Sequence, residues 1–258
     1  MPVPALRVEY AETSLLGGRD DNQDRCAVAV SDHAALMLVV DGMGGHADGA
    51  IAAETAQKML VEAFWHVPQP LFDPLGFLHL TLGRVHEAVV ALGALLPLEQ
   101  RPRATCAVCL VQGDSAYWAH IGDSRLYQLR RGRVVERTRD HSHVEFLIRE
   151  GLITEGQAQA HPMRNFVECC VGGESMLPEM TITGRRKLEP GDVLLACSDG
   201  LWGALDDESI ARPWSKAAET PGETLDDALA GLARRAVSNA GPGADNTTGV
   251  VLRWLGRA

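Results

Sequence analysis

The sequence predicts an α+β fold in which two mostly antiparallel sheets pack together and are flanked by helices. Short apolar runs follow one another with turn residues between them, and no regular alternation of single strands with single helices is present. Hydrophobic residues make up 46% of the 258 residues, which is enough for one sizeable core. No linker divides the chain, so we expect a single domain over residues 1–258.

The first part of the chain predicts three strands and two helices. A glycine-rich loop, 40–49, precedes the first helix, whose residues Ile51, Thr55, Met59 and Phe64 fall near one stripe. Three prolines follow that helix and end it. The expected elements are strands at 5–16, 26–31 and 35–40, then helices at 50–65 and 75–97.

The rest of the chain predicts a series of hairpins, an irregular helical segment and a final group of helices. Gly113-Asp114 and Gly122-Asp123 are turn signals between three successive strands, and Arg131-Gly132 is a third. The expected elements are strands at 105–111, 115–121 and 124–130, a helical segment at 144–160, a strand at 192–197, helices at 206–217 and 223–239, and a strand at 247–255.

Charge and composition argue against several classes of protein. The formal net charge is −10, with 34 acidic and 24 basic residues, whereas a nucleic-acid binder would carry a basic stripe. The N-terminus lacks the pattern of a signal peptide, and no apolar stretch suits a membrane span. Six cysteines form no disulfide pattern, and Cys106 and Cys109 face opposite sides of one expected strand. We therefore expect a cytoplasmic protein with free thiols and no membrane partner.

Four apolar runs each meet an aspartate that sits beside a small or polar residue. A carboxylate at the end of a buried strand is unfavourable unless a positive charge lies near it. Each Asp alone is a turn or cap signal, but four strand ends gathered at one edge would form a cage of oxygen ligands for Mg²⁺ or Mn²⁺. The four pairs are Asp41-Gly42, Asp123-Ser124, Asp199-Gly200 and Asp245-Asn246.

Two metal ions held roughly 3.5–4 Å apart lower the pKa of a bridging water and create a hydroxide that attacks phosphorus in line. Such a site must also hold the phosphate. Arg19 precedes a polar, acidic turn, and its guanidinium fork suits two phosphate oxygens. By itself, an ordinary surface salt bridge is the simpler interpretation of Arg19.

These residues belong to six short motifs that occur in order along the chain. The order resembles that of the metal-dependent Ser/Thr protein phosphatases, the protein phosphatase 2C family, in its compact bacterial form, over about residues 6–255. The motifs are Arg19-x-x-Asn22-Gln23-Asp24, Val40-Asp41-Gly42-Met43-Gly44-Gly45-His46, Gly122-Asp123-Ser124-Arg125-Leu126-Tyr127, Asp140-His141-Ser142, Cys197-Ser198-Asp199-Gly200-Leu201-Trp202 and Asp245-Asn246-x-Thr248.

The resemblance implies a four-layer α-β-β-α sandwich and a role for each motif residue. It implies hydrolysis of phosphoserine and phosphothreonine in proteins, two central Mn²⁺ or Mg²⁺ ions and a third ion. It also implies a mobile flap over residues 142–170. The implied roles are Asp41 bridging the two central ions, the Gly42 carbonyl binding one of them, Asp199 and Asp245 completing the ligands of the first ion, Asp123 with Asp199 holding the third ion, Asp24 in the first or second ligand shell, and Arg19 binding the phosphate.

The chain departs from the family pattern at three places. Many relatives carry Glu where this chain has Gln23, which removes one charge from the expected metal cage. A His that some members place directly after Asp-Gly is replaced by Met43, so either a metal-bound water or His46 is left as the general acid. The Thr and Arg that follow the flap in bacterial relatives are absent from residues 165–172.

Two groups of residues have competing interpretations. His141 and His143 follow Asp140 like a ligand cluster, but a turn hydrogen-bonded to strand ends is the preferred explanation of this segment. Trp118 and Trp202 are expected to pack in the core and the wall of the site rather than to bind substrate.

Other activities fit the sequence less well. The Gly-rich loop of P-loop enzymes, the remaining kinase motifs and a reactive Cys in a phosphate loop are all missing. A non-catalytic regulatory or binding member of the same fold remains the alternative, although such a protein has no need of buried acids. The expected partners are phosphorylated proteins and a cognate Ser/Thr kinase. Residues 140–173 look closest to phosphatases paired with kinases of type VI secretion.

Overall fold

Two antiparallel sheets form the centre of the chain. The computed structural model describes residues 5–43, 47–216 and 224–257. Within these residues, one sheet has the order β1 (Leu6–Leu15), β12 (Thr247–Arg257), β11 (Val193–Cys197), β7 (Arg125–Arg130) and β8 (Arg133–Arg137). The other has the order β10 (Thr181–Lys187), β6 (Ser115–Ile121), β5 (Cys106–Gln112), β3 (Ala34–Met43), β4 (Arg103–Ala104) and β9 (Val171–Gly172), and β2 (Asp24–Val30) pairs with β3.

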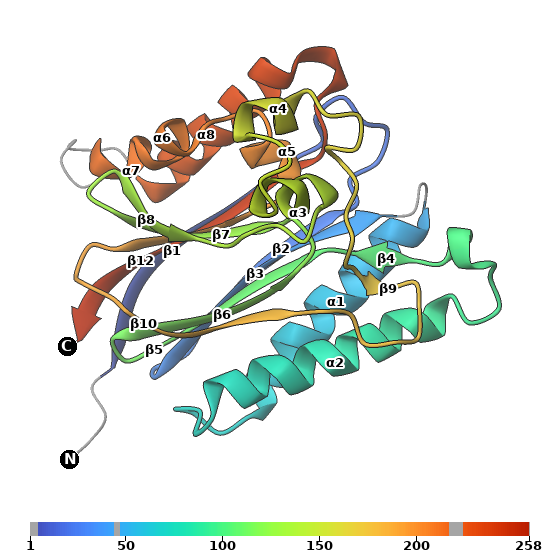
Figure 1. Cartoon of the computed structure of the whole chain (residues 1–258). Coiled ribbons are helices and arrows are strands. Elements are labelled where there is room, and N and C mark those ends of the chain that lie inside the picture. The colour runs from blue at the N-terminus through green and yellow to red at the C-terminus, as the bar shows by residue number, and fades with distance from the viewer. Residues whose placement is uncertain (1–4, 44–46, 217–223, 258) are drawn as a thin grey trace.

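Helices cover the outer face of each sheet, which gives four layers (Figure 1). Helices α1 (Ala47–His66) and α2 (Pro74–Leu92) lie on the sheet that contains β3. The opposite outer layer is made by α5 (Asp199–Trp202), α6 (Asp207–Ala211), α7 (Pro213–Lys216) and α8 (Leu225–Ala240). Short 3₁₀ turns, Leu98–Gln100 and Gly241–Gly243, complete the connections. The expected fold of two antiparallel sheets flanked by helices is confirmed.

Three apolar clusters hold the four layers together. The cluster between the sheets includes Met37, Trp118 and Leu194, all nearly or fully buried. Strand residues of the opposite parity face the helices, so Leu38 packs toward α1 and α2, and Leu195 packs toward α5 to α8. Because side chains alternate across a strand, each sheet contributes to two clusters at once. Cys106 and Cys109 fall in different clusters, as their odd spacing predicts.

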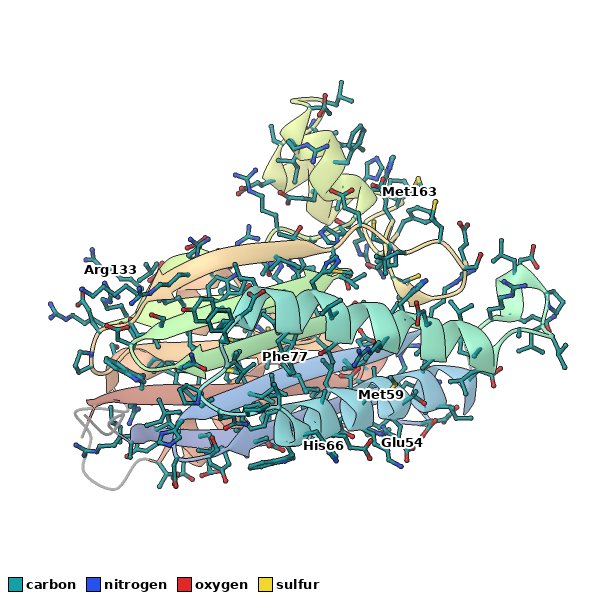
Figure 2. The ribbon with its side chains drawn as sticks, turned by 90° about the horizontal axis from the view of Figure 1, so that it is seen from below. Glu54, Met59, His66, Phe77, Arg133 and Met163 are labelled. Carbon is teal, nitrogen blue, oxygen red and sulfur yellow. The ribbon has the colours of Figure 1, made fainter. Side chains whose placement is uncertain are left out.

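Figure 2 looks onto the paired helices α1 and α2, with Met59 on the first and Phe77 on the second. Helix α2 begins at a strong signal, since the Asp73 carboxylate accepts from the Gly76 N–H at 2.9 Å and Pro74 occupies the first turn. It is the one helix of the described chain long and apolar enough to cross a membrane, by length and composition only. Its buried face, which includes Leu78 and Leu82, packs into the cluster beneath it as a core helix does.

The flap segment, residues 142–170, leaves the sandwich after β8 and holds α3 (His143–Arg149) and α4 (Glu155–Gln159). Ser142 caps α3 and Thr154 caps α4, so the expected irregular helix is two short helices with separate starts. Met163 marks this segment in Figure 2, where it projects beside the sandwich.

Most expected elements are confirmed, and the errors have clear causes. The second helix ends at Leu92 rather than at residue 97, because Gly93 ends it and the chain turns toward Pro97. Strand β10 was not predicted from the sequence because its residues are mostly polar and half-exposed at a sheet edge. The short pair β4 and β9 carries too few residues for a pattern.

Side chains buried between the sheets should contribute strongly to stability. We expect Leu194→Ala, which opens a cavity at a fully buried position, to lower the free energy of unfolding by about 2–5 kcal/mol. The control Leu80→Ala, at a side chain that is 61% exposed on α2, should change it by less than about 0.5 kcal/mol. Urea unfolding in the presence of a chelator measures both, and equal effects would contradict this description of the core.

Candidate metal and phosphate site

Five aspartates meet at one end of the two sheets. Asp24 begins β2, Asp41 lies near the end of β3, and Asp123 occupies the turn between β6 and β7. Asp199 begins α5 directly after β11, and Asp245 precedes β12. Asp41 is central, because the charges of all four others act on it. The structure therefore brings together carboxylates that lie as far apart in the chain as Asp24 and Asp245.

The pairing of β2 with β3 places two of these aspartates side by side. Asp24 and Asp41 are direct partners in the antiparallel register, so their side chains share one face of the sheet. The Asp41 carbonyl accepts from the Thr105 N–H at 2.8 Å, and the Gly42 N–H donates to the Gln23 carbonyl at 3.1 Å. A Cβ on Gly42 would meet the carbonyl of Gly49, so only glycine fits this close backbone approach.

Ser198 links Asp24 to the last strand. Its hydroxyl donates to the Asp24 carboxylate at 2.7 Å and accepts from the Thr248 N–H at 3.1 Å. All three residues are almost completely buried. The hydroxyls of Ser198 and Thr248 thus hydrogen-bond the Asp24 carboxylate without adding a positive charge.

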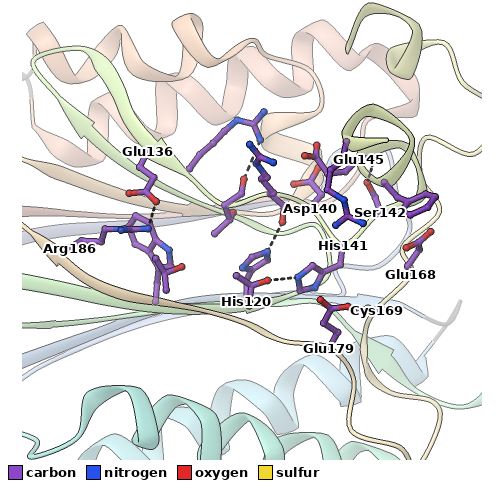
Figure 3. A pocket seen from close by; sticks show the side chains of 18 residues that line it. His120, Glu136, Asp140, His141, Ser142, Glu145, Glu168, Cys169, Glu179 and Arg186 are labelled. Carbon is purple, nitrogen blue, oxygen red and sulfur yellow. Dashed lines mark hydrogen bonds and ion pairs between the residues drawn. The ribbon is translucent and has the colours of Figure 1, made fainter. Parts of the chain in front are cut away.

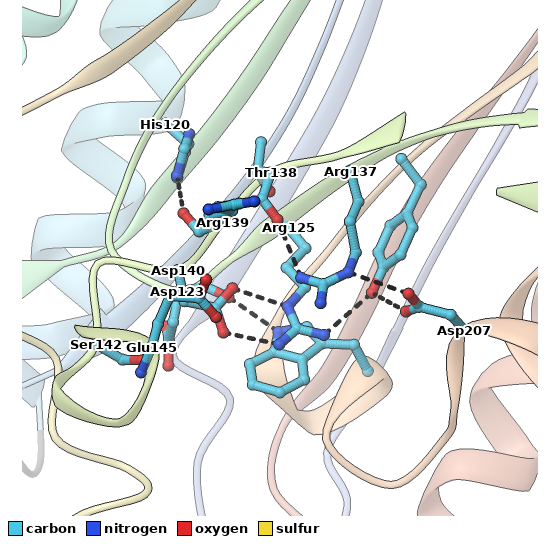
Figure 4. A network of polar contacts seen from close by, with 12 residues as sticks. His120, Asp123, Arg125, Arg137, Thr138, Arg139, Asp140, Ser142, Glu145 and Asp207 are labelled. Carbon is cyan, nitrogen blue, oxygen red and sulfur yellow. Dashed lines mark hydrogen bonds and ion pairs between the residues drawn. The ribbon is translucent and has the colours of Figure 1, made fainter. Parts of the chain in front are cut away.

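A polar network supports the turn that bears Asp123 (Figure 4). Gly122 has φ +98° and abuts Thr105, so a side chain at this position would be strained and crowded. Arg125 binds Asp140 with two hydrogen bonds of 2.8 and 2.7 Å, and its guanidinium stacks 3.4 Å above the ring centre of Trp202. The Trp202 ring N–H donates to the Asp123 carbonyl at 2.9 Å, which fixes the turn from the outside.

Arg19 lies in the loop between β1 and β2 and reaches the acidic cluster. Its guanidinium donates to the Asp245 carboxylate at 2.6 Å, although the side chain is 56% exposed. The loop itself is fixed by Asn246, whose amide oxygen accepts from the Gln23 N–H at 2.9 Å and whose NH₂ donates to the carbonyls of Leu16 and Asp21. The salt-bridge interpretation of Arg19 is therefore confirmed, and its binding of the phosphate stays a prediction.

The electrostatics of four of the carboxylates favour a bound cation. Burial first, and then the neighbouring negative charges, raises the pKa of Asp24 to about 7 and that of Asp199 to about 6. The same causes raise the pKa of Asp41 and Asp123 well above the ordinary value. Ionised together, these groups would repel one another, so a divalent cation among them is the natural compensation.

The donor set fits Mg²⁺ or Mn²⁺, because it consists of carboxylate oxygens and backbone carbonyls rather than thiols or imidazoles. Among the described residues, no three acidic, His or Cys side chains already surround one point as ligands. Binding therefore requires that the carboxylates turn toward an ion. The ligand roles of Asp24, Asp41, Gly42, Asp123, Asp199 and Asp245 stay predictions on this geometry.

The remaining sequence candidates fall in different places. His46 lies outside the described residues, and Met43 ends β3. His143 begins the flap helix and contacts Glu168, whereas His141 is bonded to the end of β6, as the preferred interpretation expected. Trp118 is in the core and Trp202 is in the wall of the site.

Sequence reasoning missed the supporting roles of three residues that the motifs contain. Ser198 directly precedes Asp199, Arg125 follows Asp123 by two residues, and Asn246 follows Asp245. A polar residue beside a buried acid is a usable signal, but its partner cannot be named until the register of the strands is known.

A cleft of about 420 Å³ opens beside the acidic end, between β8, β10 and the flap (Figure 3). His120, Asp140 and His141 line its inner part, and Phe146 and Arg149 of α3 line its flap side. The ion pair between Arg186 and Glu136 spans its outer end from one sheet to the other. The flap thus borders a space that begins next to the Asp123 turn.

Comparisons with known proteins agree with this arrangement. A family model described as protein phosphatase 2C matches residues 17–232. The serine/threonine protein phosphatase PstP of Mycobacterium tuberculosis is 34% identical over 208 residues, which cover 80% of this chain and 38% of PstP. The chain therefore spans less than half the length of that relative.

Solved structures match nearly the whole chain. A serine/threonine phosphatase of S. agalactiae has a TM-score of 0.86 and 28% identity, with 96% of this chain and 100% of that one covered. The catalytic domain of PstP in complex with two manganese ions has a TM-score of 0.75 and 30% identity, with 95% and 97% covered. PppA of Pseudomonas aeruginosa, described as a key regulatory component of the type VI secretion system, has a TM-score of 0.77 and 28% identity, with 97% and 99% covered.

The metal-free protein should lose stability as pH rises because of Asp24. Its pKa is raised in the fold to about 7 from the ordinary 3.8, so between these values the folded chain holds a proton that the unfolded chain has released. We expect Asp24→Asn to reduce this slope, because Asp41, Asp123 and Asp199 still contribute theirs. The measurement is urea unfolding with chelator across that pH range, taken as the difference between the two proteins. An unchanged difference at every pH would contradict the raised pKa.

The Ser198 hydroxyl should matter for metal affinity. We expect Ser198→Ala, which removes the donor to Asp24, to weaken Mn²⁺ binding by about 10- to 100-fold. The exposed Ser238→Ala on α8 is the matched control and should bind Mn²⁺ as the parent does. Calorimetric titration with Mn²⁺ gives both affinities, and equal values in the two variants would rule out the supporting role.

Proposed function

Because this chain belongs to the protein phosphatase 2C family, we propose that it is a metal-dependent phosphatase that hydrolyses phosphoserine and phosphothreonine in proteins. The observation that carries the proposal is the set of five clustered, mutually repelling aspartates, of which Asp24 and Asp123 are buried, beside an arginine at the rim. Family membership indicates the reaction, and the clustered carboxylates are the proposed ligands of the metal ions that it requires.

The metal site is assigned to the chain's own oxygen ligands. Asp41, Asp199 and Asp245 would hold two central ions together with the Gly42 carbonyl, and Asp123 with Asp199 would hold a third. Bound Mn²⁺ or Mg²⁺ supplies an activated water and neutralises charge on the phosphate. Asp41 lies near the end of β3, where the bond from the Thr105 N–H to its carbonyl fixes the backbone, so its carboxylate would be placed to serve both central ions.

Arg19 is assigned to the substrate phosphate. Its guanidinium is held at the rim by one hydrogen bond to Asp245, which leaves further N–H groups for an anion. An exposed side chain anchored in this way can bind a phosphate that arrives from solvent and place it over the acidic end. The bond to Asp245 also restricts the conformations of the Arg19 side chain, so less conformational entropy is lost when the phosphate binds.

The non-catalytic alternative explains less of the structure. Gathering five interacting carboxylates without a cation, two of them buried, costs stability, and a protein that only binds partners gains nothing from that cost. Asp24 and Asp41 could be replaced by Asn without loss of packing volume in such a protein. Their retention therefore favours a working metal site.

The proposed partners are phosphorylated proteins, among them a cognate Ser/Thr kinase and the substrates of that kinase. The similarity to PppA does not favour type VI secretion over other pathways. The streptococcal phosphatase is equally identical in sequence and has the higher TM-score. The partner is therefore proposed by its chemistry, a phosphorylated Ser or Thr on an accessible protein segment.

Hydrolysis of an aryl phosphate tests the activity directly. We expect turnover with Mn²⁺ or Mg²⁺, none with chelator, and a loss of at least about 100-fold in Asp41→Asn and Asp199→Asn, because each removes a charged ligand. The control Asp226→Asn, at an exposed position on α8, should keep full activity. Turnover that persists in chelator would contradict the proposal. Normal Mn²⁺ binding without any turnover on aryl phosphates or phosphopeptides would favour the regulatory alternative.

A further inference from the structure

His141 joins the turn that bears Asp123 to two other parts of the molecule. Its backbone N–H donates to the Gly122 carbonyl at 2.9 Å, and its ring Nδ1 accepts from the Gly122 N–H at 3.2 Å. One residue therefore bonds both the donor and the acceptor of the glycine that directly precedes Asp123. On the other side of the ring, Nε2 lies 2.8 Å from the Thr181 hydroxyl of β10.

These contacts determine the form of the imidazole. A ring nitrogen that accepts from a backbone N–H carries no proton, so the neutral ring holds its proton on Nε2 and donates it to Thr181. The ring also stacks on His120, with centres 4.5 Å apart, and His120 is fixed in turn by its own bond to the Arg139 carbonyl at 2.7 Å. The imidazole of His141 is thus held on both edges and on one face.

The two ends of the flap also meet at this residue. The flap leaves the sandwich at Ser142, directly after His141, and on its return the Glu168 N–H donates to the His141 carbonyl at 2.8 Å. The His143 N–H donates to the Phe166 carbonyl at 3.0 Å, which closes the neck of the flap. Figure 3 shows His141 in the cleft between His120 and the flap residues Ser142 and Glu168.

We propose that His141 is a positioning residue for the metal site. By hydrogen-bonding both backbone groups of Gly122, it sets the orientation of Asp123. Asp123 sits at a turn whose glycine has a positive φ, and such a turn has other conformations available unless both of its backbone groups are held. The Trp202 ring fixes the Asp123 carbonyl, and His141 fixes the peptide groups of Gly122. The proposal rests on the proposed function, because it assigns Asp123 to a bound ion.

Three substitutions separate the contacts of the ring. His141→Ala removes both ring bonds. His141→Asn keeps an acceptor at the place of Nδ1, so it can still bind the Gly122 N–H, whereas His141→Gln reaches toward Thr181 and loses the acceptor for Gly122. All three keep the backbone bonds of residue 141. His143→Ala is the matched control, since that ring contacts Glu168 and aromatic rings of the flap rather than the turn.

The measurement is calorimetric titration with Mn²⁺ in the parent and in an Asp123→Asn background. We expect His141→Ala and His141→Gln to weaken the Asp123-dependent binding about ten-fold, and His141→Asn to weaken it by less than about three-fold. In the Asp123→Asn background the same substitutions should have no further effect, because the group they position is gone. His143→Ala should bind Mn²⁺ like the parent in both backgrounds.

The result that overturns the inference is an equal loss of affinity with and without Asp123, or no loss in His141→Gln. Urea unfolding in chelator shows whether a variant is folded, and if His141→Ala is not, the comparison of His141→Asn with His141→Gln decides. A parent protein that fails to bind Mn²⁺ would instead contradict the proposed function. The two failures therefore give different results in one set of titrations.

Discussion

The mutual repulsion of buried carboxylates is the constraint on which the rest of this structure depends. Asp24 and Asp41 are brought together by the register of two strands, and Asp199 is brought to them by the start of a short helix. Burial and like charge raise the pKa of each. The scaffold accepts this cost at a single end of the sandwich, and the three apolar clusters elsewhere supply the stability that permits it.

The hydrogen bonds around the carboxylates orient them and leave most of their charge uncompensated. The Ser198 hydroxyl donates to Asp24, the Asn246 backbone N–H donates to Asp245, and the charge of Arg125 acts mainly on Asp140. Arg19 contributes one exposed ion pair at the rim. On the proposed function, bound ions would supply the missing positive charge inside the site, and Arg19 would bind the phosphate at the rim. One end of the molecule would then hold both cations and an anionic ester.

Much of the fold and the candidate site could be predicted from the sequence, because apolar runs that meet an aspartate beside a small or polar residue are visible without coordinates. The order of the strands within each sheet could not, since pairing joins segments such as β1 and β12 that lie at opposite ends of the chain. For the same reason, the hydrogen bonds of Ser198 to Asp24 and of His141 to Gly122 could not be predicted, although both residues lie inside recognised motifs. Polar edge strands such as β10 lack the apolar alternation on which strand prediction relies.

The most direct test of the central claim is the anomalous diffraction of crystals soaked in Mn²⁺. This account predicts two strong peaks at the acidic end, with the Asp41 carboxylate between them and Asp199 and Asp245 turned toward one of the ions. Saturated crystals in which Mn²⁺ lies only on the surface, with those three carboxylates unchanged, would contradict it.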